Sequence, residues 1–349
     1  MLPAILTAFG LTPGDYSIEP FGSGLINHTW KVKGATGSYI LQCINKSIFK
    51  SPQAIAINLR LLEKYFKANY PDYLFAAPLP AVNGEYLVVA DEEYYRLAPF
   101  IKNSHTVDTI DQPGQAFEAA KQFGKFSRLL NDFDAGQLQY TLPDFHNLNL
   151  RAGQFNAAVQ NATPDRLTLA AEEIKAVEAN AAIAETYDQI VQGRQIPLRV
   201  IHHDTKISNV LFDDHDKGLC VIDLDTVMPG YFISDVGDMM RTYLSPVSEE
   251  ERDLDLVQIS EANFAAIYKG YMQEMGDVLT AVEKNLFIYA GKFMIYMQAL
   301  RFLTDFLNGD IYYPTQYPGH NLARTQNQLT LLERYIQSEE KFKELINNQ

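Results

Sequence analysis

Cysteine and tryptophan are scarce in this chain of 349 residues, which contains two cysteines and one tryptophan. Cys43 and Cys220 are too few and too far apart for a disulfide framework or a zinc site, so we expect reduced, buried thiols. The first ten residues have neither a basic segment nor an adequate apolar stretch, which predicts no secretory signal. The longest apolar segment, residues 286–307, contains three charged residues and predicts a buried helix in a cytoplasmic protein.

Positive charge is also in short supply. The chain has 29 Lys and Arg against 43 Asp and Glu, a formal net charge of -14. This balance repels nucleic acid and anionic membrane surfaces, and we expect neither as a partner. It does not exclude a small nucleotide, because a Gly-rich loop and Mg²⁺ can supply local positive potential. No obligatory protein partner is inferred.

The first hundred residues alternate short strand patterns with turn signals, which predicts a small α+β lobe over residues 1–100. The expected strands span residues 17–21, 29–33, 39–44, 86–90 and 94–99. One helix is expected over residues 52–69, where Ser51 and Pro52 supply an N-cap and a first-turn proline.

Residues 101–349 are predicted to form a larger, mostly helical lobe, because a chain of this length exceeds one compact core. Helical spacing of apolar residues recurs over residues 116–133, 151–160, 167–192, 261–275, 280–307 and 323–347. Residues 200–225 interrupt these helices and read as a strand and a hairpin.

The hairpin region carries the strongest chemical signal. His202 and Asp204 are followed, after four residues, by Asn209, and this is the spacing of a kinase catalytic loop. Two apolar runs joined by a turn then lead to Asp223. Because antiparallel strands bring their outer ends together, we expect Asn209 and Asp223 to be neighbours, with Asp204 close by. Such oxygen ligands suit Mg²⁺, and a carboxylate can accept the proton of an attacking hydroxyl.

A different chemistry uses the same region. His202, His203, Asp204, Asp223 and Asp225 could together hold two metal ions in a hydrolase, although that leaves the position of the Asn209 amide unexplained. We expect His202 to orient the loop rather than to bind a ligand.

The small lobe contains a short glycine-rich segment that includes Gly22, Ser23 and Gly24 between two expected strands. This context favours a loop lying over phosphates, and the chain contains no Walker sequence. At the position where a kinase places its phosphate-binding lysine stands Gln42, and Lys46 is a candidate substitute for the missing charge.

The connection between the lobes is the remaining candidate for nucleotide binding. Residues 96–101, with Pro99 and Ile101, could hold an adenine through backbone hydrogen bonds or could be a plain connector. Because Gln42 replaces the usual lysine, a nucleotide-binding pseudokinase with a scaffolding role stays open as an alternative.

Residues 202–213 and 221–230 resemble the aminoglycoside phosphotransferase and choline kinase superfamily. Residues 21–29, 234–241 and 301–313 extend the likeness, which is nearest to the N-acetylhexosamine 1-kinases and spans nearly the whole chain. The resemblance implies a protein-kinase-like two-lobed fold that uses ATP with Mg²⁺.

The resemblance also implies site residues. Asp204 would be the catalytic base, Asn209 and Asp223 the metal ligands, and His146 and Arg301 would hold the acceptor. The expected reaction is phosphoryl transfer from ATP to a sugar hydroxyl, the anomeric one of an N-acetylhexosamine. Other small alcohols, such as homoserine, choline or an aminoglycoside, are the alternative acceptors. A neutral sugar would be fixed by a few polar side chains, whereas choline would favour an acidic or aromatic cage.

Overall fold

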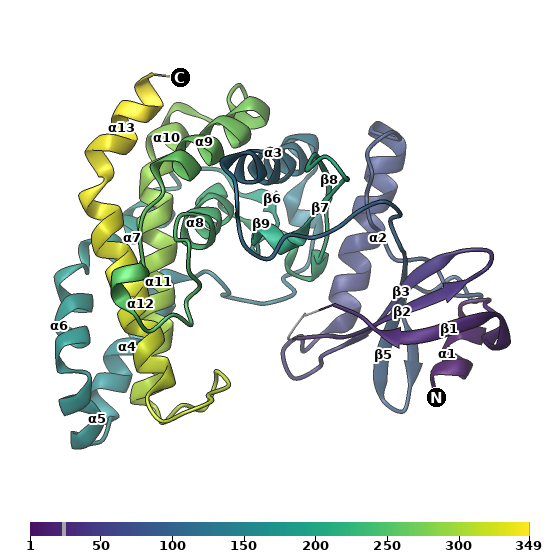
Figure 1. Ribbon diagram of the computed structural model, residues 1–349, viewed down its shortest axis with the longest axis horizontal. Helices are drawn as coiled ribbons and strands as arrows, with labels where there is room; N and C mark the ends of the chain where they lie inside the picture. Colours follow the sequence, from purple (N-terminus) through teal and green to yellow (C-terminus); the bar gives the residue numbers. More distant parts are fainter. Residues whose placement is uncertain (23–25, 349) are drawn as a thin grey trace.

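The computed structural model describes residues 1–22 and 26–348. A strand-rich lobe and a helical lobe lie side by side, with α2 (Pro52–Asn69) on the face of the small lobe that is turned toward the large one (Figure 1). The predicted α+β, kinase-like two-lobed fold is confirmed. For the boundary between the lobes we propose residue 100, because the last strand of the small lobe ends at Pro99.

The small lobe is built on an antiparallel five-stranded sheet in the order β1-β2-β3-β5-β4. One face packs against α1 (Leu2–Ala8) around Val32, Leu41 and Leu97, so that alternate residues of the same strands point the other way. The strands are β1 (Tyr16–Pro20), β2 (His28–Gly34), β3 (Ser38–Ile44), β4 (Val88–Ala90) and β5 (Glu93–Pro99).

Helix α2 begins at Pro52, as predicted, but the side chain of its N-cap Ser51 makes no capping hydrogen bond. Its apolar side joins the core of the large lobe. The buried side chain of Asn58 donates to the backbone oxygens of Gln139 and Val227, which ties the helix to two segments of that lobe. The boundary in sequence therefore does not coincide with a boundary between the cores.

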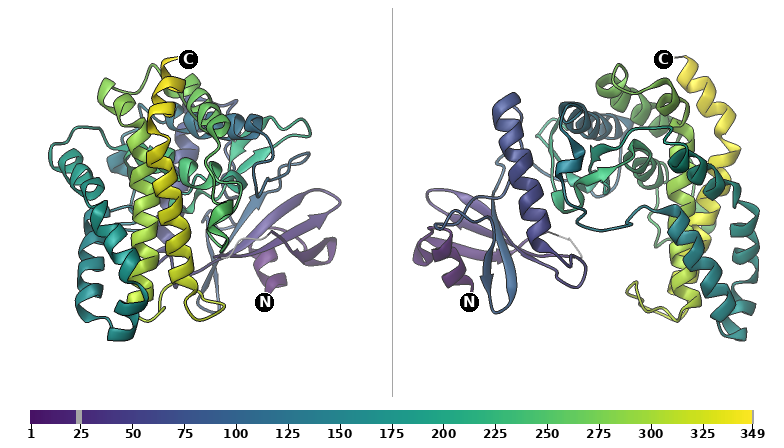
Figure 2. Two further views of the ribbon diagram at one scale, coloured as in Figure 1. Left: turned by 60° about the vertical axis from the view of Figure 1, so that its left-hand side comes forward. Right: turned by 180° about the vertical axis from the view of Figure 1, so that it is seen from behind.

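The helices of the large lobe pack around α11 (Phe287–Leu307), which is buried on nearly all sides and runs beside α12 (His320–Gln337) (Figure 2). Among the residues that the structure describes, no helix is both long and apolar enough to cross a bilayer. The other helices are α3 (Pro113–Leu129), α4 (Leu148–Asn161), α5 (Pro164–Leu169), α6 (Ala171–Ala179), α7 (Ala182–Gln192), α8 (Phe232–Tyr243), α9 (Glu261–Met275), α10 (Ala281–Asn285) and α13 (Glu339–Asn347).

The large lobe also contains two small antiparallel sheets. β6 (Arg199–Ile201) pairs with β9 (Met228–Gly230), and β7 (Val210–Phe212) pairs with β8 (Gly218–Val221). Short helical turns join them: η3 (Ile207–Asn209) precedes β7, and η4 (Leu224–Thr226) follows β8. These connections carry the residues singled out from the sequence.

Three helix predictions were too long. Residues 167–192 form parts of three helices, and residues 280–307 and 323–347 form two each. Helices α1 and α8 were not predicted. The apolar residues of α8 do recur at helical spacing, so the signal was present, but its two buried aspartates resemble loop residues.

Candidate active site

The β7–β8 hairpin brings the candidate metal ligands together. Val210 pairs with Val221, and beyond the hairpin the Ile222 N–H donates to the backbone oxygen of Asn209 at 2.8 Å. Asp223 is the residue after Ile222, so this hydrogen bond places it close to Asn209.

Asp204 is a partly exposed carboxylate with a cation beside it. Lys206 Nζ lies 3.1 Å from Asp204 Oδ1, and the Asp204 side chain is 21% exposed. Burial raises the pKa of Asp204, but the charges of Lys206 and His202 and two hydrogen bonds outweigh it, and the net direction is down. The carboxylate is therefore ionised at neutral pH, as a base requires. Lys206 was not singled out from the sequence.

Asn209 and Asp223 differ in how the surrounding structure constrains them. Asn209 Nδ2 donates to the Asp204 backbone oxygen at 2.9 Å, which fixes the amide and leaves its oxygen as a possible ligand. Asp223 has a left-handed backbone with φ 56°, a conformation that only Gly, Asn and Asp adopt readily. Burial and the charges of Asp225 and Asp204 raise the pKa of Asp223 to about 7.

These residues fit a magnesium ion. Asn209 and Asp223 offer hard oxygen atoms, and Mg²⁺ takes its other ligands from water and nucleotide phosphates. The part of the chain that the structure describes contains no group of three His, Cys, Asp or Glu that could hold a metal without such help. His202 Nε2 contacts the Ile222 oxygen and His203 Nδ1 the Thr226 oxygen, so the backbone engages one nitrogen of each ring. The lack of a three-residue ligand group in the described part of the chain is what speaks against the two-metal hydrolase.

Helix α8 anchors residues 202–209, which we call the catalytic loop. Asp235 accepts the backbone N–H groups of His202 and His203 at 2.9 and 2.7 Å, and Asp238 accepts that of Thr205 at 2.8 Å. Burial raises the pKa of Asp235 to about 7, against the effect of its two donors. The side chain of Asp235 is fully buried, so these bonds fix the loop in a place that water does not reach.

Asp235 and Arg241 both lie on α8 but do not form an ion pair with each other. Arg241 binds Asp238 and Glu249, because one helical turn places residue 238 and not residue 235 beside it. Gly237, on the same helix, lets α8 approach α11 closely, since a Cβ there would collide with the Ala290 backbone oxygen.

His203 also has a left-handed backbone, with φ 67°. Its ring is buried, and this lowers its pKa to about 3. His202 is fully buried and bonded at both its backbone and its ring, which supports the prediction that it orients the loop.

The predicted nucleotide residues Gly22, Pro99 and Ile101 lie at or beyond the ends of two strands of the sheet, β1 and β5. Gly22 follows β1 with φ 82°, a conformation that favours glycine, whereas Ser23 and Gly24 lie outside the described residues. Pro99 ends β5, and Ile101 follows it in the connection, where its backbone oxygen accepts the Ser104 hydroxyl.

Gln42 lies on the sheet face away from α1 and is bonded on both sides. It donates to Thr29 Oγ1 at 3.2 Å and accepts from Arg96 Nε at 2.9 Å. Lys46, the suggested substitute, instead pairs with Glu93 at 2.9 Å. The cation next to Gln42 is thus Arg96, which the sequence did not single out because only the β3–β5 pairing brings it there.

His146 and Arg301, the predicted acceptor residues, share one region. His146 stacks on Phe145 with ring centroids 4.4 Å apart, and the Arg301 guanidinium lies 5.5 Å from the centroid of the Phe145 ring. Arg301 also lies 5.5 Å from the Tyr313 ring. The Arg151 guanidinium donates to the backbone oxygen of Phe145. We call His146, Arg151, Arg301 and Tyr313 the acceptor corner.

The acceptor corner is rich in nitrogen donors that lack partners. Within the described ranges, His146 Nδ1 and Arg151 Nε are buried without a hydrogen bond, and Arg301 has no carboxylate partner and donates a hydrogen bond only to Gln298. Burial, His203 and Arg301 lower the pKa of His146 well below its ordinary value, so it is neutral. The His146 and His203 rings are 5.4 Å apart, which connects the corner to the catalytic loop.

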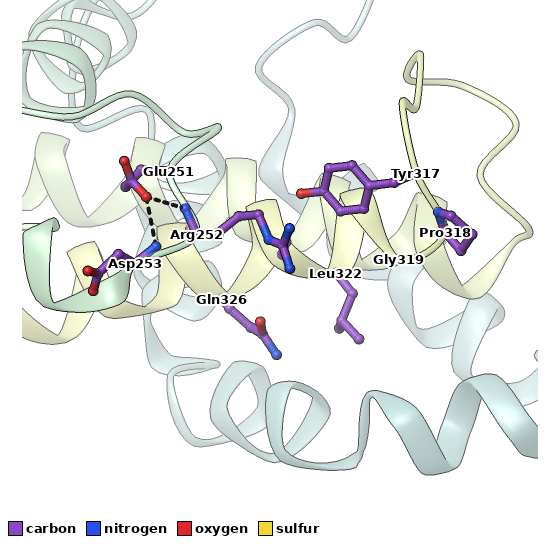
Figure 3. A pocket seen from close by; sticks show the side chains of 9 residues that line it. Glu251, Arg252, Asp253, Tyr317, Pro318, Gly319, Leu322 and Gln326 are labelled. Atoms are coloured by element: carbon purple, nitrogen blue, oxygen red, sulfur yellow. Dashed lines mark hydrogen bonds between the residues drawn. The ribbon is translucent and has the colours of Figure 1, made fainter.

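A separate hollow of about 650 Å³ contains none of these residues. It lies between residues 251–253 and the start of α12, where the Arg252 guanidinium is beside the Tyr317 ring (Figure 3). Glu251 there accepts the backbone N–H groups of its two successors, so its carboxylate is engaged locally.

The model of the phosphotransferase enzyme family matches residues 17–268. Among solved structures, spectinomycin phosphotransferase in complex with ADP and spectinomycin is 14% identical, with 97% of this chain and 98% of that chain covered and a TM-score of 0.61. A microcompartment-associated aminopropanol kinase is 14% identical over 97% of both chains, with a TM-score of 0.65. A choline/ethanolamine kinase family protein from Mesorhizobium loti is 14% identical over 95% and 91% of the two chains, with a TM-score of 0.56.

Proposed function

The chain belongs to the phosphotransferase enzyme family, as a small-molecule kinase, and from this premise we propose that it transfers the γ-phosphate of ATP to the anomeric hydroxyl of an N-acetylhexosamine. The observation that carries the proposal is the convergence of Asp204, Asn209 and Asp223 at the open end of the β7–β8 hairpin. A phosphoryl-transfer site needs a base, a metal and in-line positioning, and this arrangement offers a carboxylate for the base and two oxygen-bearing side chains that would hold the metal.

In the proposed reaction, Asp204 accepts the proton of the attacking hydroxyl. The adjacent Lys206 keeps this carboxylate ionised and adds positive charge where the phosphoryl group would pass. Asn209 and Asp223 would hold Mg²⁺, which neutralises charge on the phosphate oxygens when bound. Pro99, Ile101 and Gly22, with Ser23 and Gly24, would contact the nucleotide, whereas the amide of Gln42, the remaining predicted residue, is engaged by Thr29 and Arg96.

The acceptor corner supports a neutral acceptor over a cationic one. Arg151 and Arg301 carry positive charge and, among the described residues, have no carboxylate within ion-pair distance. A choline or an aminoglycoside would be repelled there, whereas the hydroxyl and acetamido oxygens of an amino sugar can accept from these donors. The resemblance of residues 301–313 to the N-acetylhexosamine 1-kinases agrees with this direction.

The test is nucleotide consumption over a panel of acceptors: N-acetylhexosamines, other free sugars, homoserine, choline, aminopropanol and an aminoglycoside. We expect turnover with an N-acetylhexosamine and none with its 1-O-methyl glycoside, in which the anomeric hydroxyl is blocked. Turnover of the glycoside would contradict the site of phosphorylation, and preference for choline or aminopropanol would contradict the acceptor class. Nucleotide binding without turnover on any acceptor would favour the pseudokinase.

A further inference from the structure

A row of polar side chains crosses the sheet face that is turned away from α1. Thr29, Gln42 and Arg96 are cross-strand partners on β2, β3 and β5. Gln42 uses both ends of its amide, donating to Thr29 and accepting from Arg96 Nε. The glutamine therefore orients the arginine, which a lysine could not do because it has donors only.

Arg96 extends from this row to the large lobe. Its Nη1 pairs with Asp225 Oδ1, and the two side chains are 5% and 2% exposed. The second oxygen of Asp225 accepts Asn27 Nδ2 at 2.7 Å, and Asn27 Oδ1 accepts the Asn45 backbone N–H at 3.0 Å. Asp225 belongs to η4, whose N-cap is the candidate metal ligand Asp223. Two elements of the small lobe thus hold the carboxylate that lies two residues from that ligand.

The burial of the pair distinguishes a positioning role from direct phosphate binding. A phosphate-binding arginine would present its fork to the ligand, whereas the Arg96 guanidinium is nearly inaccessible and is committed to Gln42 and Asp225. A buried ion pair is not by itself a source of stability, and its well-supported use is to specify one arrangement of the parts that it joins. Here those parts are the two lobes.

We propose that Arg96, oriented by Gln42, is a positioning residue that holds Asp225 and thereby sets Asp223 in its metal-binding place against the small lobe. The inference rests on the proposed function, since it assigns Asp223 to the metal. Gln42 is then a fitted part of the site, and restoring the usual kinase lysine damages it, because lysine offers Arg96 no acceptor and adds a cation beside it.

The test measures ADP affinity by calorimetry, with Mg²⁺ and with a chelator, for wild type, Gln42→Lys, Gln42→Glu and Arg96→Lys. Arg128→Lys, which alters an exposed pair with Asp277, is the matched control. We expect Gln42→Lys and Arg96→Lys to weaken binding of Mg²⁺–ADP about tenfold or more and that of metal-free ADP less than about threefold. Gln42→Glu retains an acceptor for Arg96, so we expect Mg²⁺ to strengthen its binding of ADP as much as it does in wild type.

Two outcomes overturn the inference while leaving the proposed function intact. In one, Gln42→Lys tightens both forms of ADP; in the other, Arg96→Lys weakens both forms equally, as loss of a direct phosphate contact would. A wild-type chain that binds no nucleotide overturns the proposed function instead. Thermal unfolding shows which variants fold, and if Arg96→Lys does not, the two substitutions of the half-buried Gln42 carry the test.

Discussion

In the catalytic loop, the backbone N–H groups of His202, His203 and Thr205 all donate to buried carboxylates of α8. In the adjacent acceptor corner, by contrast, His146 Nδ1 and Arg151 Nε are buried with no partner among the described residues. Buried polar groups in a folded chain are nearly always satisfied, so each exception calls for an explanation. His202 Nδ1 is also buried without a partner among the described residues, so the comparison is between the backbone of the catalytic loop, which α8 holds, and the side chains of the acceptor corner, which we propose are left for a ligand.

The largest effect is expected at the base. Asp204→Asn removes the proton acceptor, so we expect kcat to fall at least about a hundredfold while the affinity for nucleotide changes little. Steady-state kinetics and calorimetric binding measure the two quantities. Asp214→Asn, in the exposed β7–β8 turn, is the matched control. A kcat within about tenfold of wild type would remove Asp204 from the mechanism.

Asp235→Ala tests the anchoring of the catalytic loop. The substitution strands two buried backbone N–H groups, which costs about 1–3 kcal/mol each, so we expect the free energy of unfolding to fall by roughly 3 kcal/mol. Urea denaturation measures it. Asp277→Ala breaks an exposed pair with Arg128 and should cost no more than about 1 kcal/mol. Equal losses in the two variants would mean that α8 does not anchor the loop.

A smaller effect concerns pH. Burial lowers the pKa of His203 to about 3 from an ordinary 6.5, so the unfolded chain binds a proton that the folded chain excludes. The stability associated with this group is complete above pH 6.5 and is lost as the pH falls toward 3. Between pH 6.5 and 5, wild type should lose about 2 kcal/mol more than His203→Asn, because an interval of about 1.5 pH units below the unfolded-state pKa corresponds to about that energy.

His203→Asn is a suitable comparison because asparagine tolerates the left-handed backbone at this position. The variant also loses the contact with the Thr226 oxygen, but that loss shifts its stability by the same amount at each pH. Parallel pH profiles, measured by denaturation at several pH values, would show that His203 is not the group that titrates.

Local signals in the sequence were enough for the hairpin and several helices. The bounds of α2 and α9 were predicted to the residue, and two apolar runs around a turn identified β7 and β8. The proximity of Asn209 and Asp223 followed from that hairpin, because it depends only on antiparallel pairing within a short segment.

Contacts between distant segments could not be predicted in this way. Arg96 and Asp225 are 129 positions apart, and their pairing depends on how the lobes are oriented. The donors in the acceptor corner come from the loop before α4, from α4 and from α11, and nothing in their spacing shows that they converge. The resemblance named His146 and Arg301 but gave no reason to include Arg151.

The acceptor corner is tested by the charge of Arg301. Arg301→Gln keeps donors but removes the charge, and we expect the KM for the sugar acceptor to rise about tenfold with kcat little changed, since a hydrogen bond to a charged group is worth about 1.5–3 kcal/mol. Arg166→Gln is the control, because Arg166 pairs with Asp310 and should affect unfolding more than KM.

Arg301→Glu sharpens the comparison: if the unpaired guanidinium repels cations, this variant should improve the kcat/KM for choline or aminopropanol relative to the sugar. If Arg301→Gln changes only the unfolding temperature, the corner is a structural cluster like the catalytic loop, and the distinction between the two regions fails.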